Sequence, residues 1–183
     1  MSLDYISQLL SCYHPAYAEE NVYKQHMLDF IRLHPDALLR SCHLGQFTAS
    51  CWLVNFSVSH TLLMHHVKHD CWLQPGGHAD GDHRLLHVAK KEAVEESGLS
   101  SIKVVDEGIF DLDIHLIPPY KGVASHYHFD VRFLMQADSE EPVCHNDESH
   151  AMHWVALSDV ETYNNERSLL RMRDKSLSEL GCG

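Results

Sequence analysis

Three carboxylates on one face of a predicted helix are the residues of this chain best suited to chemistry. Glu92, Glu95 and Glu96 stand at positions i, i+3 and i+4, and on a helix they fall within an arc of about 100°. Like charges at this spacing repel, each pair costing roughly 0.2–0.5 kcal/mol on an isolated helix. A hard divalent cation with oxygen ligands would neutralise them. The pattern therefore predicts a metal site, and the plain alternative is a solvated acidic face.

The sequence around these carboxylates predicts how they are positioned. A glycine-rich turn at Gly76 and Gly77 precedes the helix, and Gly98 ends it. Small residues on a neighbouring flank would let the helix axis lie close against a sheet, which would fix the carboxylates relative to the turn. This flank consists of Leu86, Ala89, Ala93 and Ser97.

The segment from residue 77 to residue 99 resembles the Nudix box, the signature of a family of metal-dependent hydrolases. Gly77 opens the pattern, and the three glutamates, Gly98 and Leu99 follow in register without a gap. The wider stretch from Trp72 to Asp82 is also similar to a subgroup of bacterial Nudix proteins. The resemblance covers roughly residues 45 to 160.

Three positions depart from the family pattern. His83 stands where the first Glu of the box belongs, Lys91 replaces an Arg, and Ala93 is smaller than the usual apolar residue. Lys91 keeps the positive charge but lacks the planar fork of arginine, so it would orient a neighbouring carboxylate more loosely. His83 could donate to a carboxylate, ligate a softer metal or lie at the surface, and these alternatives stay open.

The resemblance implies hydrolysis of a nucleoside diphosphate linked to another moiety, with Mg²⁺ or Mn²⁺ as the cofactor. It assigns the metal ions to Glu92, Glu95 and Glu96, helped by the backbone carbonyl of Gly76. Metal ions on a pyrophosphate neutralise its charge and activate water for in-line attack. The glycines would let the main chain approach the ions where a side chain would block it.

A further acidic residue, Glu148, lies six residues before Trp154 in a polar stretch. Family members often place a general base or outer metal ligand in a loop before such a Trp-containing strand. The base must reach the attacking water directly or through one bridging water. Glu92 is the competing candidate for this catalytic role, and an acidic surface loop is the plain alternative for Glu148.

Several other side chains could contact a substrate near this site. His78 could contact a phosphate, and Trp72 or Tyr120 could stack on a base or ring. Arg132 or Lys121 could offer positive charge to a phosphate. The alternatives are core packing for the aromatic residues and solvated surface positions for the cations.

The chain contains 17 histidines, a high number. Two groups have spacing that could ligate Zn²⁺ or Ni²⁺, but neither matches a defined metal-site signature. The alternative is that they are polar strand and loop residues near the mouth of the site. The groups are His65, His66 and His69, and His126 and His128 with Asp130 two residues on.

Composition and charge limit the class of protein. A chain of 183 residues with 44% hydrophobic and 22% charged residues fits one globular domain plus an extension. Its net charge of −12 argues against a nucleic-acid polymer as partner but allows a small phosphorylated substrate. Six scattered cysteines without a CxxC pair, and the lack of a signal-peptide or membrane-spanning pattern, predict a cytoplasmic protein with reduced thiols and no membrane partner.

The order of predicted elements indicates an α/β (α+β) fold, a Nudix-like α/β/α sandwich with a mixed sheet. We expect an N-terminal helical extension over residues 1–44, packed on a Nudix-like hydrolase domain over residues 45–183 that ends in a helix. The N-terminal helices could cover a homodimer interface or the substrate pocket. The predicted helices run from Ser2 to Leu10, over 17–33, 35–41 and 167–180, with a further short helix capped by Ser158. The predicted extended segments are 48–56, 61–65, 102–113, 127–136 and 152–156.

Three functions fit the pattern. The first is a metal-dependent pyrophosphohydrolase of a nucleotide-derived diphosphate. The second is an isomerase similar to isopentenyl diphosphate isomerase, which the abundant histidines favour and the intact box disfavours. The third is a non-catalytic nucleotide-binding or regulatory domain, suggested by the departures at His83 and Lys91. The sequence leaves the substrate and the oligomeric state open.

Overall fold

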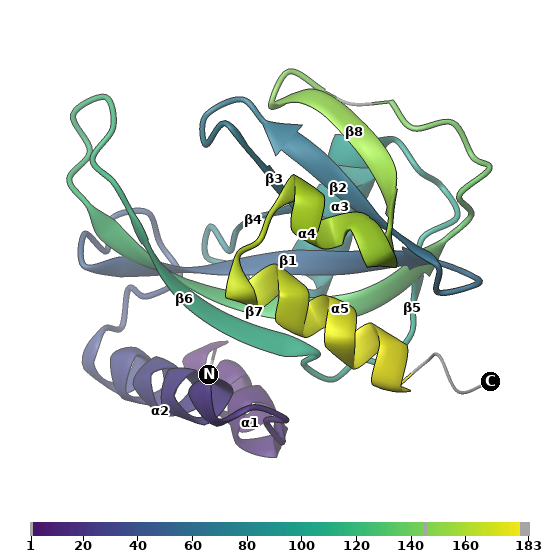
Figure 1. Ribbon diagram of the computed structural model, residues 1–183. Coiled ribbons are helices and arrows are strands. Elements are labelled where there is room, and N and C mark those ends of the chain that lie inside the picture. The colour runs from purple at the N-terminus through teal and green to yellow at the C-terminus, as the bar shows by residue number, and fades with distance from the viewer. Residues whose placement is uncertain (1, 145, 180–183) are drawn as a thin grey trace. The chain divides into compact units, whose positions relative to one another are not determined.

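The computed structural model describes residues 2–144 and 146–179 (Figure 1). The helices are α1 (Ser2–Cys12), α2 (Ala18–Leu33), α3 (Leu85–Ser97), the 3₁₀ turn η1 (Leu157–Asp159), α4 (Val160–Tyr163) and α5 (Arg167–Glu179). The strands are β1 (Gly45–Asn55), β2 (His60–His66), β3 (Cys71–Leu73), β4 (Gly76–His78), β5 (Lys103–Val104), β6 (Asp111–Ile117), β7 (His126–Ala137) and β8 (Ser149–Ala156).

The described residues form two compact units. Unit 1 comprises the residues up to Ser50 together with Gly76–Ala89 and Glu107–Phe133, and unit 2 comprises Cys51–Pro75, Lys90–Asp106 and the residues from Leu134 onward. Strands β1 and β7 and helix α3 run from one unit into the other. Hydrogen bonds connect the strands in the order β3-β2-β1-β7-β5, with β4 on β1, β6 on β7 and β8 on β2.

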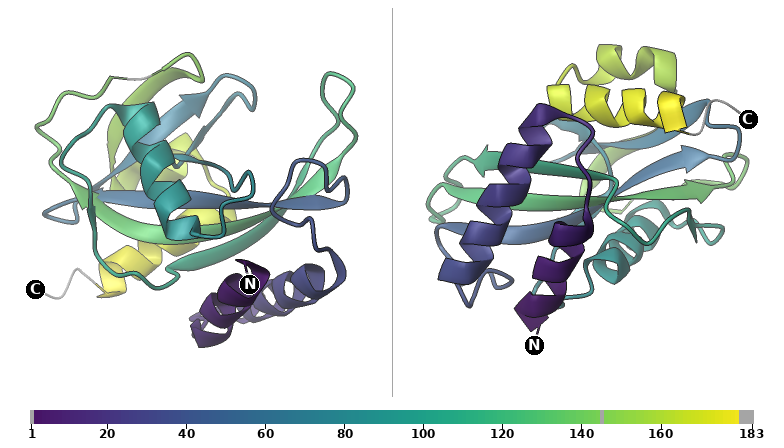
Figure 2. Two further views of the ribbon diagram at one scale, coloured as in Figure 1. Left: turned by 180° about the vertical axis from the view of Figure 1, so that it is seen from behind. Right: turned by 90° about the horizontal axis from the view of Figure 1, so that it is seen from below.

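Helices α1 and α2 lie side by side in unit 1, next to β6 (Figures 1 and 2). Glu20 caps the start of α2, because the backbone N–H of Tyr17 donates to Glu20 Oε2 at 3.1 Å. Glu20 is fully buried, and its other oxygen accepts from the Tyr13 hydroxyl, which also lies 3.2 Å from the Phe110 carbonyl oxygen. This buried polar contact joins the start of α2 to the chain entering β6.

The sheet of unit 1 is built on two antiparallel pairs. Strand β4 pairs with β1, so that Gly76 lies opposite Ser50, and β6 pairs with β7, so that Asp111 lies opposite Arg132. Phe129 of β7 stacks on Phe30 of α2, with ring centroids 4.2 Å apart. This contact holds α2 against the sheet and contributes apolar burial.

Unit 2 centres on β2, which pairs antiparallel with β1, β3 and β8. The central strand β1 is buried along its whole length, as a strand covered on both faces must be. Trp52 on this strand is fully buried, and its indole N–H donates to Ser176 Oγ of α5 at 2.7 Å. This bond satisfies the polar atom of a large core side chain and anchors α5.

The structure confirms most of the predicted elements and differs from the prediction at four places. The turn predicted at Gly76 and Gly77 is wrong, because both residues belong to strand β4, which pairs with β1. The helix predicted over 35–41 is wrong, because this segment forms consecutive turns such as Ala37 N–H to His34 O. The extended segment predicted over 102–113 is divided between the two-residue β5 and the later start of β6. The short helix near 160 forms, but Asp159 rather than Ser158 is its N-cap residue. Leu180, the predicted end of the last helix, lies outside the described residues.

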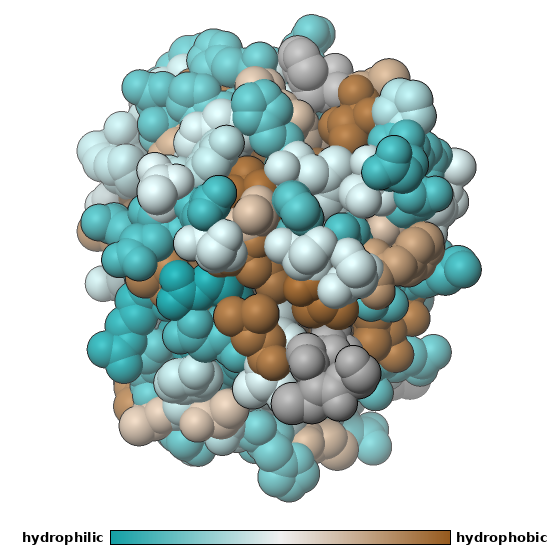
Figure 3. Space-filling model, turned by 45° about the vertical axis from the view of Figure 1, so that its right-hand side comes forward, coloured by the Kyte–Doolittle hydropathy of each residue, from teal (hydrophilic) through white to brown (hydrophobic). Residues whose placement is uncertain are grey.

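The surface mixes polar and apolar side chains. On the face drawn in Figure 3, brown hydrophobic residues lie among teal and pale polar ones. Exposed apolar residues such as Leu33, Leu44 and Leu177 are ordinary on folded proteins, so the homodimer stays a prediction. Within residues 2–144 and 146–179, no helix is both long and apolar enough to cross a membrane.

Candidate active site

The three predicted carboxylates lie on α3, inside unit 2, and differ in exposure. Glu96 is 2% exposed, whereas the side chains of Glu92 and Glu95 are 21% and 54% exposed. Glu96 lies near Cys51 of β1, a fully buried thiol whose pKa is raised by burial and, to a smaller extent, by this carboxylate. The carboxylates therefore extend from the protein interior at Glu96 to solvent at Glu95.

Lys91 joins two of these carboxylates. Its ammonium Nζ lies 3.3 Å from Glu92 Oε1 and 3.1 Å from Glu95 Oε2. Hydrogen bonding to Glu95, followed by the charge of Glu92, raises the pKa of Lys91. The lysine therefore takes the pairing position that the resemblance gives to an arginine, and it partly balances the acidic face.

The donor chemistry of this face fits a divalent cation. Three carboxylates and one ammonium leave a net charge of about −2 on the α3 face when all are ionised. All three acidic groups offer oxygen, the ligand that Mg²⁺ and Mn²⁺ prefer. The residues present are thus suitable for holding the metal that the resemblance implies.

The small-residue flank of α3 is largely buried. Ala89, Ala93 and Ser97 on the small-residue flank are fully buried, while Leu86 is half-buried. Gly98 ends the helix in the left-handed region at φ 71°, which glycine adopts without strain. After it, the N–H of Cys144 donates to the Ser97 carbonyl oxygen at 2.8 Å.

Gly76 belongs to unit 1, where it faces Ser50 at close range. A Cβ atom at Gly76 would lie 2.5 Å from Ser50 Oγ and 2.8 Å from Ser50 Cα. Ser50 cannot simply turn away, because its hydroxyl donates to Asp130 at 2.8 Å. Only glycine therefore allows β4 to pair with β1 in this register.

Gly76→Ala is expected to destabilise the protein by about 1–3 kcal/mol, the usual cost of overpacking. Urea unfolding of the purified variant measures the loss. Ser50→Gly combined with Gly76→Ala removes the contacts with Ser50 Oγ and Cβ, so the double variant should lose less than the sum of the two single changes. Simple additivity would contradict this explanation.

Arg132, predicted as a phosphate contact, lies in a buried ionic network of unit 1 and is 3% exposed. Its Nε donates to Asp130 at 2.8 Å. Its Nη1 lies 3.3 Å from Asp111 Oδ1, and its Nη2 lies 3.3 Å from Asp113 Oδ2. The opposing charges of Asp113, Asp130 and Asp111 raise its pKa despite burial. The guanidinium therefore interacts with carboxylates of the protein rather than facing solvent.

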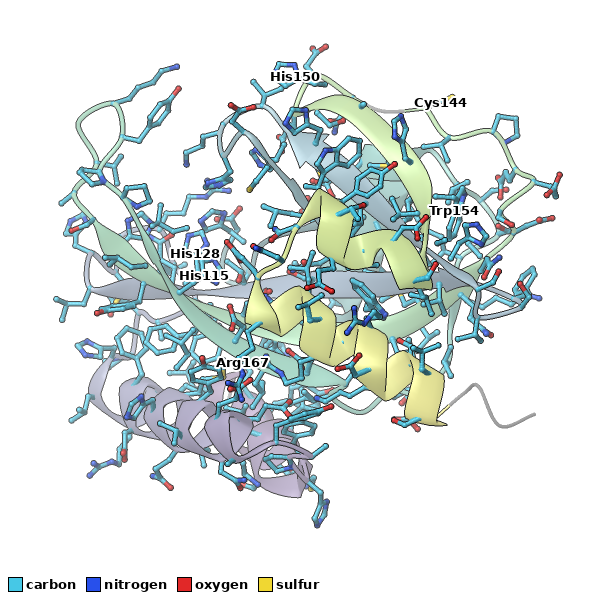
Figure 4. The ribbon with its side chains drawn as sticks, in the orientation of Figure 1. His115, His128, Cys144, His150, Trp154 and Arg167 are labelled. Carbon is cyan, nitrogen blue, oxygen red and sulfur yellow. The ribbon has the colours of Figure 1, made fainter. Side chains whose placement is uncertain are left out.

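The second histidine group lies in a larger histidine cluster of unit 1. Figure 4 shows His115 and His128 close together on the neighbouring strands β6 and β7, and their ring centroids are 5.5 Å apart. His78 lies edge-on to His128 at 4.8 Å, and His126 lies at 5.2 Å from it. Asp130, proposed with this group, instead accepts from Thr48, Ser50 and Arg132.

Trp72, the predicted stacking residue, is half-buried among side chains of unit 2. His65 stacks on its ring at 5.3 Å with an interplanar angle of 14°, and His153 lies at 4.9 Å. Tyr163 contacts the same ring edge-on at 5.1 Å. Trp72 therefore packs against three aromatic side chains of its own unit. Tyr120 is 45% exposed, and Lys121 Nζ lies 5.1 Å from its ring centre.

Glu148 lies in the exposed loop before β8, beside the end of β2. Its carbonyl oxygen accepts from the Val67 N–H at 2.9 Å. Burial lowers the pKa of His66, and the nearby charge of Glu148 opposes this effect. In unit 1, His83 is half-buried and lies edge-on to Tyr5 of α1 at 5.7 Å.

The sequence did not predict the two aspartates that pair with Arg132. Asp111 and Asp113 surround Arg132, and their alternation with period two could have placed them on one face of a strand. Their pairing with Arg132 depends on the β6–β7 register, which a single sequence does not supply.

Comparison with known proteins identifies a family. The model of the NUDIX domain matches residues 46–174. No protein of curated function matches the sequence.

Several solved structures share the fold. A binary complex of the Ap4A hydrolase of C. elegans has a TM-score of 0.60 at 16% identity, over 74% of this chain and 97% of the other. The MutT protein of Methanosarcina mazei Go1 has a TM-score of 0.58 at 14% identity, over 75% and 96%. A NUDIX-family hydrolase of Clostridium perfringens has a TM-score of 0.53 at 22% identity, over 71% and 95%. At these identities the likeness supports the fold alone, and it confirms the predicted mixed α/β architecture. In this chain the helices α1 and α2 precede that architecture.

Proposed function

Since the chain belongs to the Nudix hydrolase family, we propose that it is a metal-dependent pyrophosphohydrolase acting on a nucleoside diphosphate linked to another moiety. The observation that carries this proposal is the acidic face of α3. Glu92, Glu95 and Glu96 stand there in the register of the Nudix box, with Lys91 beside two of them. Glu96 is only 2% exposed, whereas the carboxylates of a solvated acidic helix are mostly exposed.

Each residue of the site has a proposed role. Glu92, Glu95 and Glu96 would hold Mg²⁺ or Mn²⁺, and Lys91 would orient Glu92 and Glu95. The bound ions would neutralise the diphosphate and activate a water molecule. The carbonyl oxygen of Gly76 is a further proposed ligand, on the resemblance alone.

The general base is proposed to be Glu92 or Glu148. Glu92 is partly shielded and already paired with Lys91, whereas Glu148 is exposed on a loop that could approach a substrate. Removal of the base should flatten the limb of the pH–rate profile that reports its ionisation. The variant that does so, Glu92→Gln or Glu148→Gln, identifies the base.

The proposed substrate is a small nucleotide, not a nucleic-acid polymer. His78 is the side chain we propose for a phosphate contact, because its imidazole can donate a hydrogen bond and it lies among other histidine rings of unit 1. Arg132 and Trp72 are weaker candidates for a substrate contact, because protein groups already contact both side chains. A cytoplasmic location and a homodimer remain part of this proposal.

The isomerase alternative receives less support. That chemistry places a Cys/Glu pair on opposite sides of the substrate. Cys51, which lies near Glu96, is fully buried, so its thiol cannot contact a bound molecule without rearrangement.

A substrate screen tests the proposed function. The full chain is incubated with ADP-ribose, nucleotide sugars, dinucleoside polyphosphates and nucleoside triphosphates, each with Mg²⁺, Mn²⁺ or Zn²⁺. We expect release of a nucleoside monophosphate from at least one class, abolished by a chelator. Tight nucleotide binding without turnover under every condition would instead indicate a regulatory domain, and proton exchange into isopentenyl diphosphate would indicate an isomerase.

A further inference from the structure

A mixed group of metal-binding side chains lies between the end of α2 and the start of β1, in unit 1. His34, Asp36 and Cys42 each offer one ligand atom, and the three atoms all lie within 4.8 Å of one another. Among the residues that the structure describes, this is the group of three His, Cys, Asp or Glu side chains whose ligand atoms lie close enough together to share a metal ion. We propose that these three residues bind a Zn²⁺ ion, or a similar borderline cation, at a site separate from the α3 carboxylates.

The donor set selects this class of metal. One imidazole nitrogen, one carboxylate oxygen and one thiolate sulfur are ligands of Zn²⁺, whereas Mg²⁺ takes oxygen. In a tetrahedral Zn²⁺ site the ligand atoms lie about 3.3–3.7 Å apart, from bond lengths of about 2.0–2.3 Å. Separations of up to 4.8 Å therefore need only a small inward movement of the side chains. Cys42 is 3% exposed while His34 and Asp36 are half-buried, so the ion would enter from the solvent side and keep a place for water.

The surroundings hold the ligands before any ion binds. Backbone groups of Gly45 and Leu44 hydrogen-bond to the Cys42 sulfur, and such outer contacts orient metal ligands. The His34 ring packs on Phe30 with centroids 4.3 Å apart, and its backbone N–H closes the last turn of α2 on the Phe30 carbonyl oxygen at 2.9 Å. All three ligands precede residue 46, where the match to the family begins, so the site rests on observations independent of the proposed function.

An ion at this position would stabilise the segment that contacts the turn before α3. This segment, residues 34–44, receives a hydrogen bond from the Gly81 N–H to the Leu38 carbonyl oxygen at 2.9 Å. Arg40 in the same segment makes a two-pronged ion pair with Asp80, at 2.7 and 3.0 Å. Metal binding would therefore fix the backbone that supports Asp80 and Gly81.

Cobalt binding to the metal-free full chain, in excess Mg²⁺, tests the proposal. We expect about one equivalent of Co²⁺ to bind with a thiolate-to-cobalt charge-transfer band, and Zn²⁺ to displace it and raise the Tm. Cys42→Ala should remove the band, and Asp36→Asn or His34→Ala should weaken Zn²⁺ binding at least about tenfold. Matched controls are His43→Ala and Cys12→Ala, which remove an exposed histidine beside Cys42 and an exposed cysteine, and which should bind normally.

The experiment separates this site from the α3 carboxylates. The same titration on Glu92→Gln/Glu95→Gln/Glu96→Gln should leave the thiolate band unchanged. A band that survives Cys42→Ala, or the absence of Co²⁺ and Zn²⁺ binding to the unaltered protein, overturns the proposal. Circular dichroism shows whether each variant is folded, and Asp36→Asn supplies the test if Cys42→Ala is not.

Discussion

Glu96→Gln should lower kcat on the best substrate of the screen by about a hundredfold or more, while the protein stays folded. The substitution keeps the shape of the side chain and removes only the charge that would hold a cation. Residues that merely orient metal ligands are already worth roughly 10–100-fold, so a direct ligand should be worth at least as much. Glu95→Gln should have an effect of the same order. Steady-state kinetics with Mn²⁺ and with Mg²⁺ measure both variants.

Metal binding supplies a second measurement that does not depend on the substrate. Each Glu→Gln variant should bind Mn²⁺ more weakly than the unaltered protein in a calorimetric titration. Glu107→Gln is a suitable control, because it removes an exposed carboxylate outside α3. If Glu95→Gln and Glu96→Gln both turned over at the normal rate, the α3 face would not be the catalytic site.

Arg132→Met should destabilise the fold by about 3–5 kcal/mol, the usual loss when one partner of a buried ionic group is removed. The guanidinium is 3% exposed and lies between Asp111, Asp113 and Asp130, whose side chains are 0%, 11% and 2% exposed. Without it, three buried carboxylates would repel one another and lack a counter-charge. Urea unfolding at neutral pH measures the loss.

Arg32→Met is the matched control, because Arg32 is 73% exposed and its ion pair with Asp29 should contribute about 0–1 kcal/mol. Equal losses in the two variants would contradict the assigned role of the network.

Periodicity predicted the elements whose residues bury one regular face. Helix α2, strands β1 and β7 and the box helix α3 all follow apolar spacing that is visible in the chain. The segment 35–41 is the exception: it is predicted as a short helix, but its backbone groups bond elsewhere. The Ala37 carbonyl oxygen accepts from Phe47, and the Leu38 carbonyl oxygen accepts from Gly81. Such tertiary hydrogen bonds override local preference and leave no trace in spacing.

The candidate site was predictable where it depends on one element. Glu92, Glu95 and Glu96 share a helix, so their spacing alone placed them on one face. Lys91 was expected to orient a carboxylate, and its contacts agree with that expectation. The partners of Arg132 and Trp72 come from other strands and loops, and their identity depends on registers that only the folded structure supplies.

The hydrogen bond from Gly81 to Leu38 has a consequence for how the protein can be shortened. Residues before position 46 lie outside the part that matches the family. Even so, the Leu38 carbonyl oxygen accepts the Gly81 N–H, and Arg40 forms an ion pair with Asp80. Phe129 would also lose its stacking partner Phe30 if the first helices were cut away. The N-terminal segment is therefore part of the folded core of its unit. A truncated protein that starts at residue 46 would expose apolar core surface and lose two contacts that hold the loop before α3.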